Sequence, residues 1–177
     1  MSHPQALQTK AGALAKPKNR TAKPLKSWAT SPAVRRVMQG NKSRDTRPEI
    51  AVRCAVHAMG MRYRVAAQLL AGVRRTADLV FRRARVAVFV DGCFWHGCPV
   101  HHAPPKTNAG YWAMKIEGNR VRDQHTTAML RAAGWTVLRF WSHEQPLAVA
   151  NRIAEVIQNE NGKAAAISAA KGSVACQ

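Results

Sequence analysis

The stretch Val86–His102, VAVFVDGCFWHGCPVHH, places a short apolar run directly before acidic, thiol, imidazole and aromatic side chains. A run rich in valine and phenylalanine is typical of a strand that is covered on both faces. In α/β proteins, ligands and chemistry are usually found where central strands end. The sequence therefore predicts an α/β fold with a functional site at the end of this strand.

The chain is strongly basic, with 28 Lys and Arg against nine Asp and Glu in 177 residues, a net charge of +19. This excess predicts an anionic polymer as partner, with nucleic acid as the first candidate. We expect a disordered basic arm at residues 1–30, a single domain at 31–160 and a flexible tail at 161–177. No segment is typical of a spanning helix or a basic amphipathic anchor, so we expect no membrane contact.

The N-terminus lacks the apolar core of a signal peptide, and the chain has only four cysteines, unevenly spaced. These features predict a protein of the reducing cytoplasm. In that compartment, closely spaced Cys and His indicate a metal site more than a disulfide.

A helix is predicted from the sequence T-R-P-E at Thr46, in which Glu49 can reach back to the cap, as far as Gly60. Strands are predicted next, with a short turn that folds the second strand back on the third. Their bounds are Met61–Val65, Thr76–Phe81 and Val86–Val90. A long helix, a strand and a last helix follow at Ala109–Ala133, Trp135–Trp141 and Leu147–Gln158.

Two carboxylates lie on faces that we expect to point inward. Asp78 is in the middle of the apolar strand T-A-D-L-V-F, where a charge is costly unless it is paired or binds a metal. Its partner strand ends in Asp91 and His96, and hard oxygen ligands on adjacent strands suit Mg²⁺. Asp123 on the long helix is a plausible partner that holds His96 as a general base. A solvent-facing Asp78, and an Asp123 paired with Arg120, remain open alternatives.

Soft metal ligands gather in the same loop. Cys93 and Cys98 have C-x4-C spacing and are followed by His101 and His102, and His143 comes from the end of the next strand. These are enough ligands to close a structural, tetrahedral zinc site. Two ordinary buried thiols with exposed histidines are the alternative.

Phe94 and Trp95 are an adjacent aromatic pair in this loop. Aromatic side chains most often belong to a core. In a basic protein, an aromatic pair on a loop can instead stack on bases or wedge between them.

The chain from about Val34 to Glu144 resembles the very-short-patch repair (Vsr) endonucleases, bacterial enzymes that nick DNA at T·G mismatches left by deaminated 5-methylcytosine. The ordered pieces that carry the resemblance are M-Q-G-N-K-S-R-D-T-R-P-E, A-D-L-V-F, V-F-V-D-G-C-F-W-H-G-C-P, P-K-T-N, Y-W-x-x-K-I, N-R-x-R-D and G-W-T-V-L-R-F-W. The resemblance implies a restriction-endonuclease-like fold, a mixed β-sheet flanked by helices, with a structural zinc site.

The resemblance also implies roles for individual residues. Asp78 and the backbone carbonyl of Val90 would bind Mg²⁺, with two ions expected, and Glu49 would help order metal-bound water. His96 would be the general base, supported by Asp123. The structural zinc would be held by four side chains, Cys93, Cys98, His101 and His143. The DNA-binding side chains would be Phe94 and Trp95 beside the mismatch and Met38 from the opposite groove.

Some positions depart from the pattern of well-known members. Val90 replaces a threonine, which matters little if only its carbonyl is used, and Ala77 replaces a proline. Asp91 replaces a histidine, and its role stays open between a metal ligand and a family variant. The choice between His101 and His102 as zinc ligand also stays open.

We therefore expect a Mg²⁺-dependent, strand-specific nicking endonuclease that cuts 5′ to the thymine of a T·G mismatch. The expected partners are duplex DNA with that mismatch and mismatch-repair proteins, and the expected form is a monomer associated with the bacterial nucleoid. The alternatives are a non-catalytic zinc-stabilised nucleic-acid-binding protein and a related nuclease that cuts a different DNA substrate.

Overall fold

The structure is a computed structural model that describes residues 31, 32, 35, 36, 40, 42, 44–70, 72 and 75–174. The chain divides into two compact units, Met1–Asn41 and Lys42–Gln177, and every element discussed below belongs to the second. The predicted arm at 1–30 and the DNA-binding candidate Met38 lie outside the described residues.

The helix α2 (Arg47–Ala58) confirms the prediction from T-R-P-E. Thr46 caps it in an extended conformation, and a proline occupies the first turn, where a missing N–H costs nothing. The helix stops where predicted. Gly60 has a φ of 77° and its N–H donates to the carbonyl of His57 at 2.9 Å, a left-handed stop that glycine adopts without strain.

Four strands form one mixed sheet in the order β1-β2-β3-β4. The strands are β1 (Arg64–Gln68), β2 (Thr76–Phe81), β3 (Val86–Asp91) and β4 (Thr136–Trp141). The pairs β1/β2 and β2/β3 are antiparallel, which confirms the predicted hairpin, and β3/β4 is parallel. The prediction for the first strand was wrong by three residues. The β1 ladder starts only at Arg64, opposite Val80, while Met61 and Tyr63 pack on the core before it.

The helix α3 (Ala109–Ala132) connects β3 to β4, as a parallel pair of strands requires. The last helix, α4 (Pro146–Val174), is longer than the predicted Leu147–Gln158 and includes residues 161–174, which we expected to form a tail. Within the described part of the chain, no helix has the length and apolar character that a bilayer crossing needs.

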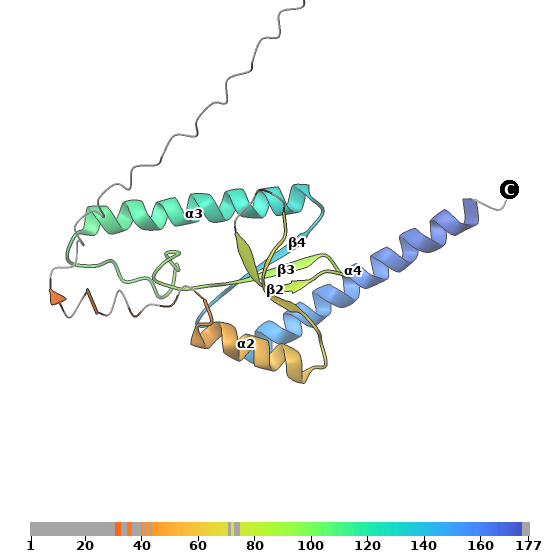
Figure 1. Cartoon of the computed structure of the whole chain (residues 1–177), viewed down its shortest axis with the longest axis horizontal. Coiled ribbons are helices and arrows are strands. Elements are labelled where there is room, and N and C mark those ends of the chain that lie inside the picture. The colour runs from red at the N-terminus through yellow and green to blue at the C-terminus, as the bar shows by residue number, and fades with distance from the viewer. Residues whose placement is uncertain are drawn as a thin grey trace, which may run out of the picture. The chain divides into compact units, whose positions relative to one another are not determined.

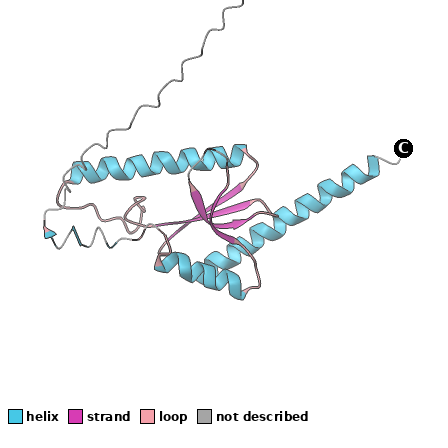
Figure 2. Ribbon diagram, viewed as in Figure 1, coloured by secondary structure: helices cyan, strands magenta, loops and turns pink. Residues whose placement is uncertain are grey.

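Helices cover both faces of the sheet, with α2 and α4 on one face and α3 on the other (Figures 1 and 2). The larger core lies under α2 and α4 and consists of Val52, Val56, Leu79, Phe81, Val86, Val88, Phe140, Val149, Ala150 and Ile153. The smaller core lies under α3 and consists of Ala77, Val80, Ala87, Leu130 and Val137. Successive side chains of β3 alternate between these two cores, because Val86 and Val88 face α2 and α4 while Ala87 faces α3.

The parallel pairing brings the ends of β3 and β4 together, with Asp91 opposite Trp141. The polar loop that follows Asp91 therefore lies beside His143, which follows β4 by two residues. This is the edge of the sheet where the sequence predicted chemistry.

Candidate active site

Asp78 does not face solvent as an edge-strand residue would. One of its carboxylate oxygens accepts a hydrogen bond from the backbone N–H of Val90 at 2.7 Å. The pairing of β2 with β3 begins only at Leu79, so Asp78 lies where the two strands separate. Burial raises the pKa of Asp78 to about 6, the Val90 N–H opposes that rise, and the negative charge of Glu49 adds to it.

Glu49 is buried on the first turn of α2, with 5% of its surface exposed. One oxygen accepts from the Thr46 hydroxyl at 2.9 Å. The other accepts from the Asp45 backbone N–H at 2.9 Å and from an Arg53 nitrogen at 3.1 Å. Glu49 therefore does contact the cap residue Thr46, through the Thr46 hydroxyl. The backbone N–H that donates to Glu49 is that of Asp45 and not that of Thr46. The same side chain is close enough to Asp78 for its charge to act there, so the capping and active-site interpretations are compatible.

The donor set at this strand end fits a hard divalent cation. Carboxylate and carbonyl oxygens are the ligands that Mg²⁺ prefers, and Asp78, Glu49 and the Val90 carbonyl offer them. The raised pKa of Asp78 indicates a buried carboxylate short of positive charge. A bound cation would supply that charge.

His96 and Asp123 form a close pair, as the sequence suggested. Nδ1 of His96 lies 2.5 Å from Oδ2 of Asp123, between the loop after β3 and the middle of α3. Asp123 thus points inward, which overturns the alternative of a surface pair with Arg120. An ionised carboxylate can only accept a hydrogen bond, so this contact places the ring proton on Nδ1 and leaves Nε2 free to accept one.

Asp91, whose role the sequence left open, forms an ion pair with Arg139 of β4. The guanidinium donates to both carboxylate oxygens, from Nε at 2.7 Å and from Nη2 at 2.6 Å. The same Nη2 lies 3.2 Å from Oδ1 of Asp123. The sequence did not single out Arg139, because only the parallel register of β3 and β4 places it beside Asp91.

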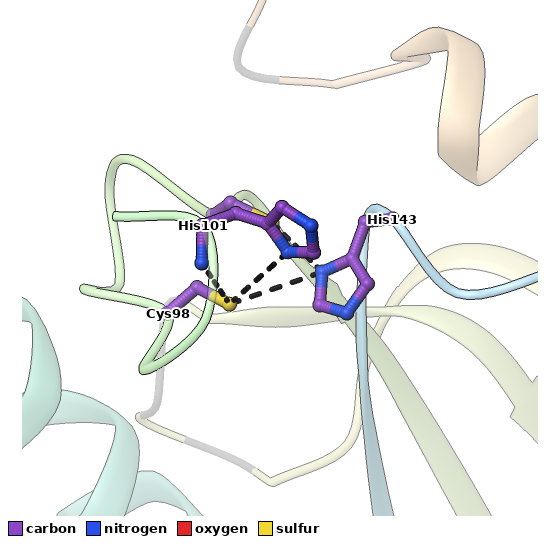
Figure 3. Close-up of side chains that lie close together, drawn as sticks. Cys98, His101 and His143 are labelled. Carbon is purple, nitrogen blue, oxygen red and sulfur yellow. Dashed lines mark hydrogen bonds between the residues drawn. The ribbon is translucent and has the colours of Figure 1, made fainter. Parts of the chain in front are cut away.

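Four soft ligands meet between the loop and the end of β4. The ligand atoms of Cys93, Cys98, His101 and His143 all lie within 4.8 Å of one another. Figure 3 shows His101 and His143 converging on the sulfur of Cys98, with their Nδ1 atoms at 4.0 and 3.8 Å. Nδ1 of His143 is also 3.1 Å from the Cys93 sulfur.

These separations fit one tetrahedral metal. Zinc at its usual bond lengths separates its S and N ligands by roughly 3.3–3.8 Å. Burial alone would raise the pKa of the Cys98 thiol, but backbone N–H groups of His101 and Val100 and the Cys93 side chain lower it below its usual value. A lowered thiol pKa favours the thiolate, the form that binds metals. His101 belongs to this cluster, whereas the ring of His102 packs against Phe94.

The aromatic pair of the loop is part of a larger cluster. The rings of Phe94 and Trp95 are 5.2 Å apart, and Trp112 of α3 contacts both, at 5.2 and 5.8 Å. Asn119 holds the loop from α3, because its side-chain N–H donates to the Trp95 carbonyl at 2.6 Å. Trp112 was not among the DNA-binding residues named from the sequence, and its position in the first turn of α3, directly after the loop, was the available signal.

Comparison with known proteins places these features in one family. The family described as DNA mismatch endonuclease Vsr matches residues 29–102, which include α2, β1, β2, β3 and the loop that carries His96 and Cys98.

Several curated relatives are similar over about three fifths of this chain. The type II nicking enzyme V.NaeI of Lentzea aerocolonigenes is 46% identical over 112 residues, which cover 62% of this chain and 68% of the relative. The type II nicking enzyme V.XorIIP of Xanthomonas oryzae is 46% identical over 117 residues, 64% of this chain and 83% of the relative. The DNA mismatch endonuclease Vsr of Escherichia coli is 32% identical over 108 residues, 59% of this chain and 65% of the relative.

Proposed function

Because this chain belongs to the Vsr family of DNA endonucleases, we propose that it nicks one strand of duplex DNA, with Mg²⁺, 5′ to the thymine of a T·G mismatch. Such mismatches arise when 5-methylcytosine is deaminated. The observation that carries the proposal is that a candidate metal ligand and a candidate general base lie at the same end of β3. Asp78 lies against the end of β3, and the His96–Asp123 pair lies just beyond that end.

His96 is the general base in this proposal. Its free Nε2 takes a proton from the attacking water, whose oxygen bonds to phosphorus while the bond from phosphorus to the leaving sugar oxygen breaks. Asp123 holds the ring through Nδ1 and stabilises the positive charge that the ring acquires. Base catalysis of this type typically contributes about 10²–10⁴-fold to a rate.

Asp78 and the Val90 carbonyl are the proposed Mg²⁺ ligands, with two ions expected at this strand end. Bound there, Mg²⁺ would neutralise charge on the phosphate and on the leaving oxygen. Glu49 has three of its acceptor positions filled by Thr46, Asp45 and Arg53, so its orientation is fixed. We assign it the role of orienting water at the site.

A structural zinc ion is proposed at Cys93, Cys98, His101 and His143. It would fasten the loop that carries His96 to the end of β4. This role suits a closed set of four ligands, because a catalytic zinc needs an open position.

DNA recognition is assigned to the aromatic cluster and to the basic surface. Phe94 and Trp95 would stack at the mismatch, supported by Trp112, and Met38 would enter from the opposite groove. The net charge of +19 supports binding to the phosphate backbone. In this proposal the protein is a cytoplasmic, nucleoid-associated monomer, and mismatch-repair proteins are candidate partners.

The test uses purified protein with a T·G duplex and with the same duplex fully matched, each with Mg²⁺ and with chelator. Wild-type protein should nick only the thymine strand of the mismatched duplex, and only with Mg²⁺. Asp78→Ala should slow nicking by about 10³-fold or more, since metal ligation supplies several kcal/mol. Glu155→Ala is the matched control, because Glu155 is an exposed carboxylate on α4.

Each outcome separates the parts of the proposal. Undiminished nicking by Asp78→Ala would refute the metal mechanism. Equal cleavage of matched and mismatched duplexes would refute T·G recognition and support the related nuclease with a different DNA substrate, a possibility favoured by the relatives named type II nicking enzymes. The alternative of a non-catalytic binding protein is set aside, because the relatives are named as nicking enzymes and as a mismatch endonuclease.

A further inference from the structure

A half-buried arginine, Arg139, lies beside the two carboxylates nearest the proposed base. The guanidinium of Arg139 contacts three side chains on the α3 side of the sheet. It forms a bidentate hydrogen bond with the Asp91 carboxylate, and its Nη2 lies 3.2 Å from Oδ1 of Asp123. Its central carbon lies 4.9 Å from the centre of the Phe89 ring. Its contacts leave it little freedom to move.

Without the guanidinium, the side chains of Asp91, His96 and Asp123 would resemble the ligands of a metal ion. One ligand atom each of Asp91, His96 and Asp123 lies within 4.8 Å of the others. Carboxylate and imidazole side chains are both ligands of divalent metal ions. Here Arg139 supplies the positive charge instead. Burial would lower the pKa of Arg139, but the hydrogen bonds and charges of Asp91 and Asp123 raise it above its usual value, so the group stays charged.

The arginine also decides which carboxylate orients the imidazole. Nδ1 of His96 is 2.5 Å from Asp123 and 3.8 Å from Asp91, so both acids are within reach of a small ring rotation. Both oxygens of Asp91 are already engaged by Arg139. Asp123 offers Oδ1 to Arg139 and Oδ2 to His96, so its carboxylate is held at both ends.

We propose that Arg139, clamped by Asp91, takes the place that a metal ion would occupy among these side chains and is the positioning residue that keeps Asp123 on His96. The inference rests on the proposed function, in which His96 is the base. Arg139 itself touches neither the water nor the phosphate in this role. Without it, the carboxylates repel each other, Asp123 loses one of its two anchors, and His96 can turn to Asp91.

A cavity beside this group makes the inference testable by chemical rescue. It has a volume of about 480 Å³ and is lined by His96, Asp123, Thr127 and Arg139 among others. Removing the Arg139 side chain enlarges a space that already reaches solvent. A free guanidinium ion can therefore enter and restore the missing cation.

The experiment compares Arg139→Ala with wild type in nicking of the T·G duplex. We expect kcat to fall about 10–100-fold with KM unchanged, the usual cost of removing a residue that orients a reacting group. Guanidinium chloride at about 10 mM, far below the molar concentrations that unfold proteins, should restore most of the rate. Methylammonium, which cannot bridge both oxygens of Asp91, should not.

Two further variants provide the controls. Arg139→Ala combined with Asp91→Asn should not respond to guanidinium, because the clamp is gone. Thr127→Val changes the wall of the same cavity, but the Thr127 hydroxyl has no hydrogen-bond partner among the described residues. It should therefore nick at the wild-type rate, with and without guanidinium. If Arg139→Ala fails to fold, Asp91→Asn alone tests the clamp, with an expected loss of about 10-fold in kcat.

A proton NMR measurement tests the inference apart from catalysis. The Nδ1 proton of His96, hydrogen-bonded to Asp123, should give a downfield resonance that is absent in His96→Gln. Arg139→Ala should lose it, and guanidinium should restore it. Full activity of Arg139→Ala, or an unchanged resonance, would overturn the inference and leave the proposed function intact. Absence of nicking by wild type would refute the proposed function, while the resonance still reports on Arg139.

Discussion

The Nδ1 atom of His96 and the Oδ2 atom of Asp123 are 2.5 Å apart, a contact between residues separated by 27 positions in the chain. Asp123→Asn keeps the shape of the side chain but replaces an acceptor by an amide that also donates, which favours the wrong tautomer of His96. We expect kcat for nicking to fall about 10²–10⁴-fold, the range of general-base catalysis, with DNA affinity unchanged. Single-turnover nicking and a gel-shift titration measure the two quantities. A loss confined to affinity would remove Asp123 from the catalytic pair.

The raised pKa of Asp78 predicts a pH-dependent stability of the Mg²⁺-free protein. With a folded-state pKa of about 6 against 3.8 for the ordinary side chain, the folded state holds a proton between these values that the unfolded state has released. Raising the pH from about 4 to about 6 therefore lowers the contribution of Asp78 to the free energy of unfolding, by on the order of 3 kcal/mol in all.

Urea unfolding at pH 4, 5, 6 and 7.5 measures this contribution as the difference between wild type and Asp78→Asn, which cannot titrate. The variant should be the more stable protein at pH 7.5, and Mg²⁺ should stabilise only wild type. Parallel pH profiles for the two proteins would contradict the assignment.

The Cys/His cluster predicts one bound zinc and a large stability loss without it. Cys98→Ser, at a side chain that is 1% exposed, should abolish zinc binding and lower the free energy of unfolding by more than about 4 kcal/mol. Cys54→Ser is the matched control, because Cys54 is exposed on α2 and outside the cluster. Zinc content of the purified proteins and their thermal unfolding give the answer. Equal zinc in both variants would exclude Cys98 as a ligand.

Gly97 separates the proposed base from a proposed zinc ligand in a conformation with φ of 62°. A Cβ added there would lie 2.9 Å from Cγ2 of Ile116 on α3. Gly97→Ala should cost about 2–4 kcal/mol of stability, from the left-handed backbone and the crowding together. It should also slow nicking, because His96 and Cys98 must shift.

Gly118→Ala is the comparison, since nothing lies within 4 Å of a Cβ at that position of α3. It should stabilise the protein by about 0.5–1 kcal/mol through helix propensity. Chemical unfolding of both variants and of wild type measures these changes in the free energy of unfolding. A Gly97→Ala protein as stable as wild type would show that the loop can move away from α3.

Local signals in the sequence were enough for most of the fold. The T-R-P-E start and Gly60 fixed the bounds of α2, and the turn at 82–85 fixed the hairpin of β2 and β3. The start of β1 was missed because apolar residues precede the ladder: Met61 and Tyr63 pack on the core without pairing. The end of α4 was missed because its apolar period fades, while its alanine-rich continuation still favours helix.

The candidate site residues that lie within one segment could be predicted from the sequence. Those that depend on contacts between distant segments were harder to predict. Val86–His102 holds His96, Cys93, Cys98 and the aromatic pair, and all could be named in advance. Arg139 could not, since its partner Asp91 is 48 residues away and depends on a parallel register that local patterns do not specify. The long-range contact of Asp123 was inferred from its helix face, because one face of α3 had to cover the sheet.

The contacts of α3 with the loop have a consequence for changing the specificity of this protein. Trp95 and His96 are consecutive residues, and each is held by α3, through Asn119 and Asp123, which are one helical turn apart. In the proposed function, redesign of the aromatic cluster for another base pair would also displace His96, because Trp95 and His96 share one peptide bond. An engineered enzyme with new aromatics therefore needs a matching change at position 119, with Asp123 kept on His96, if it is to keep its turnover.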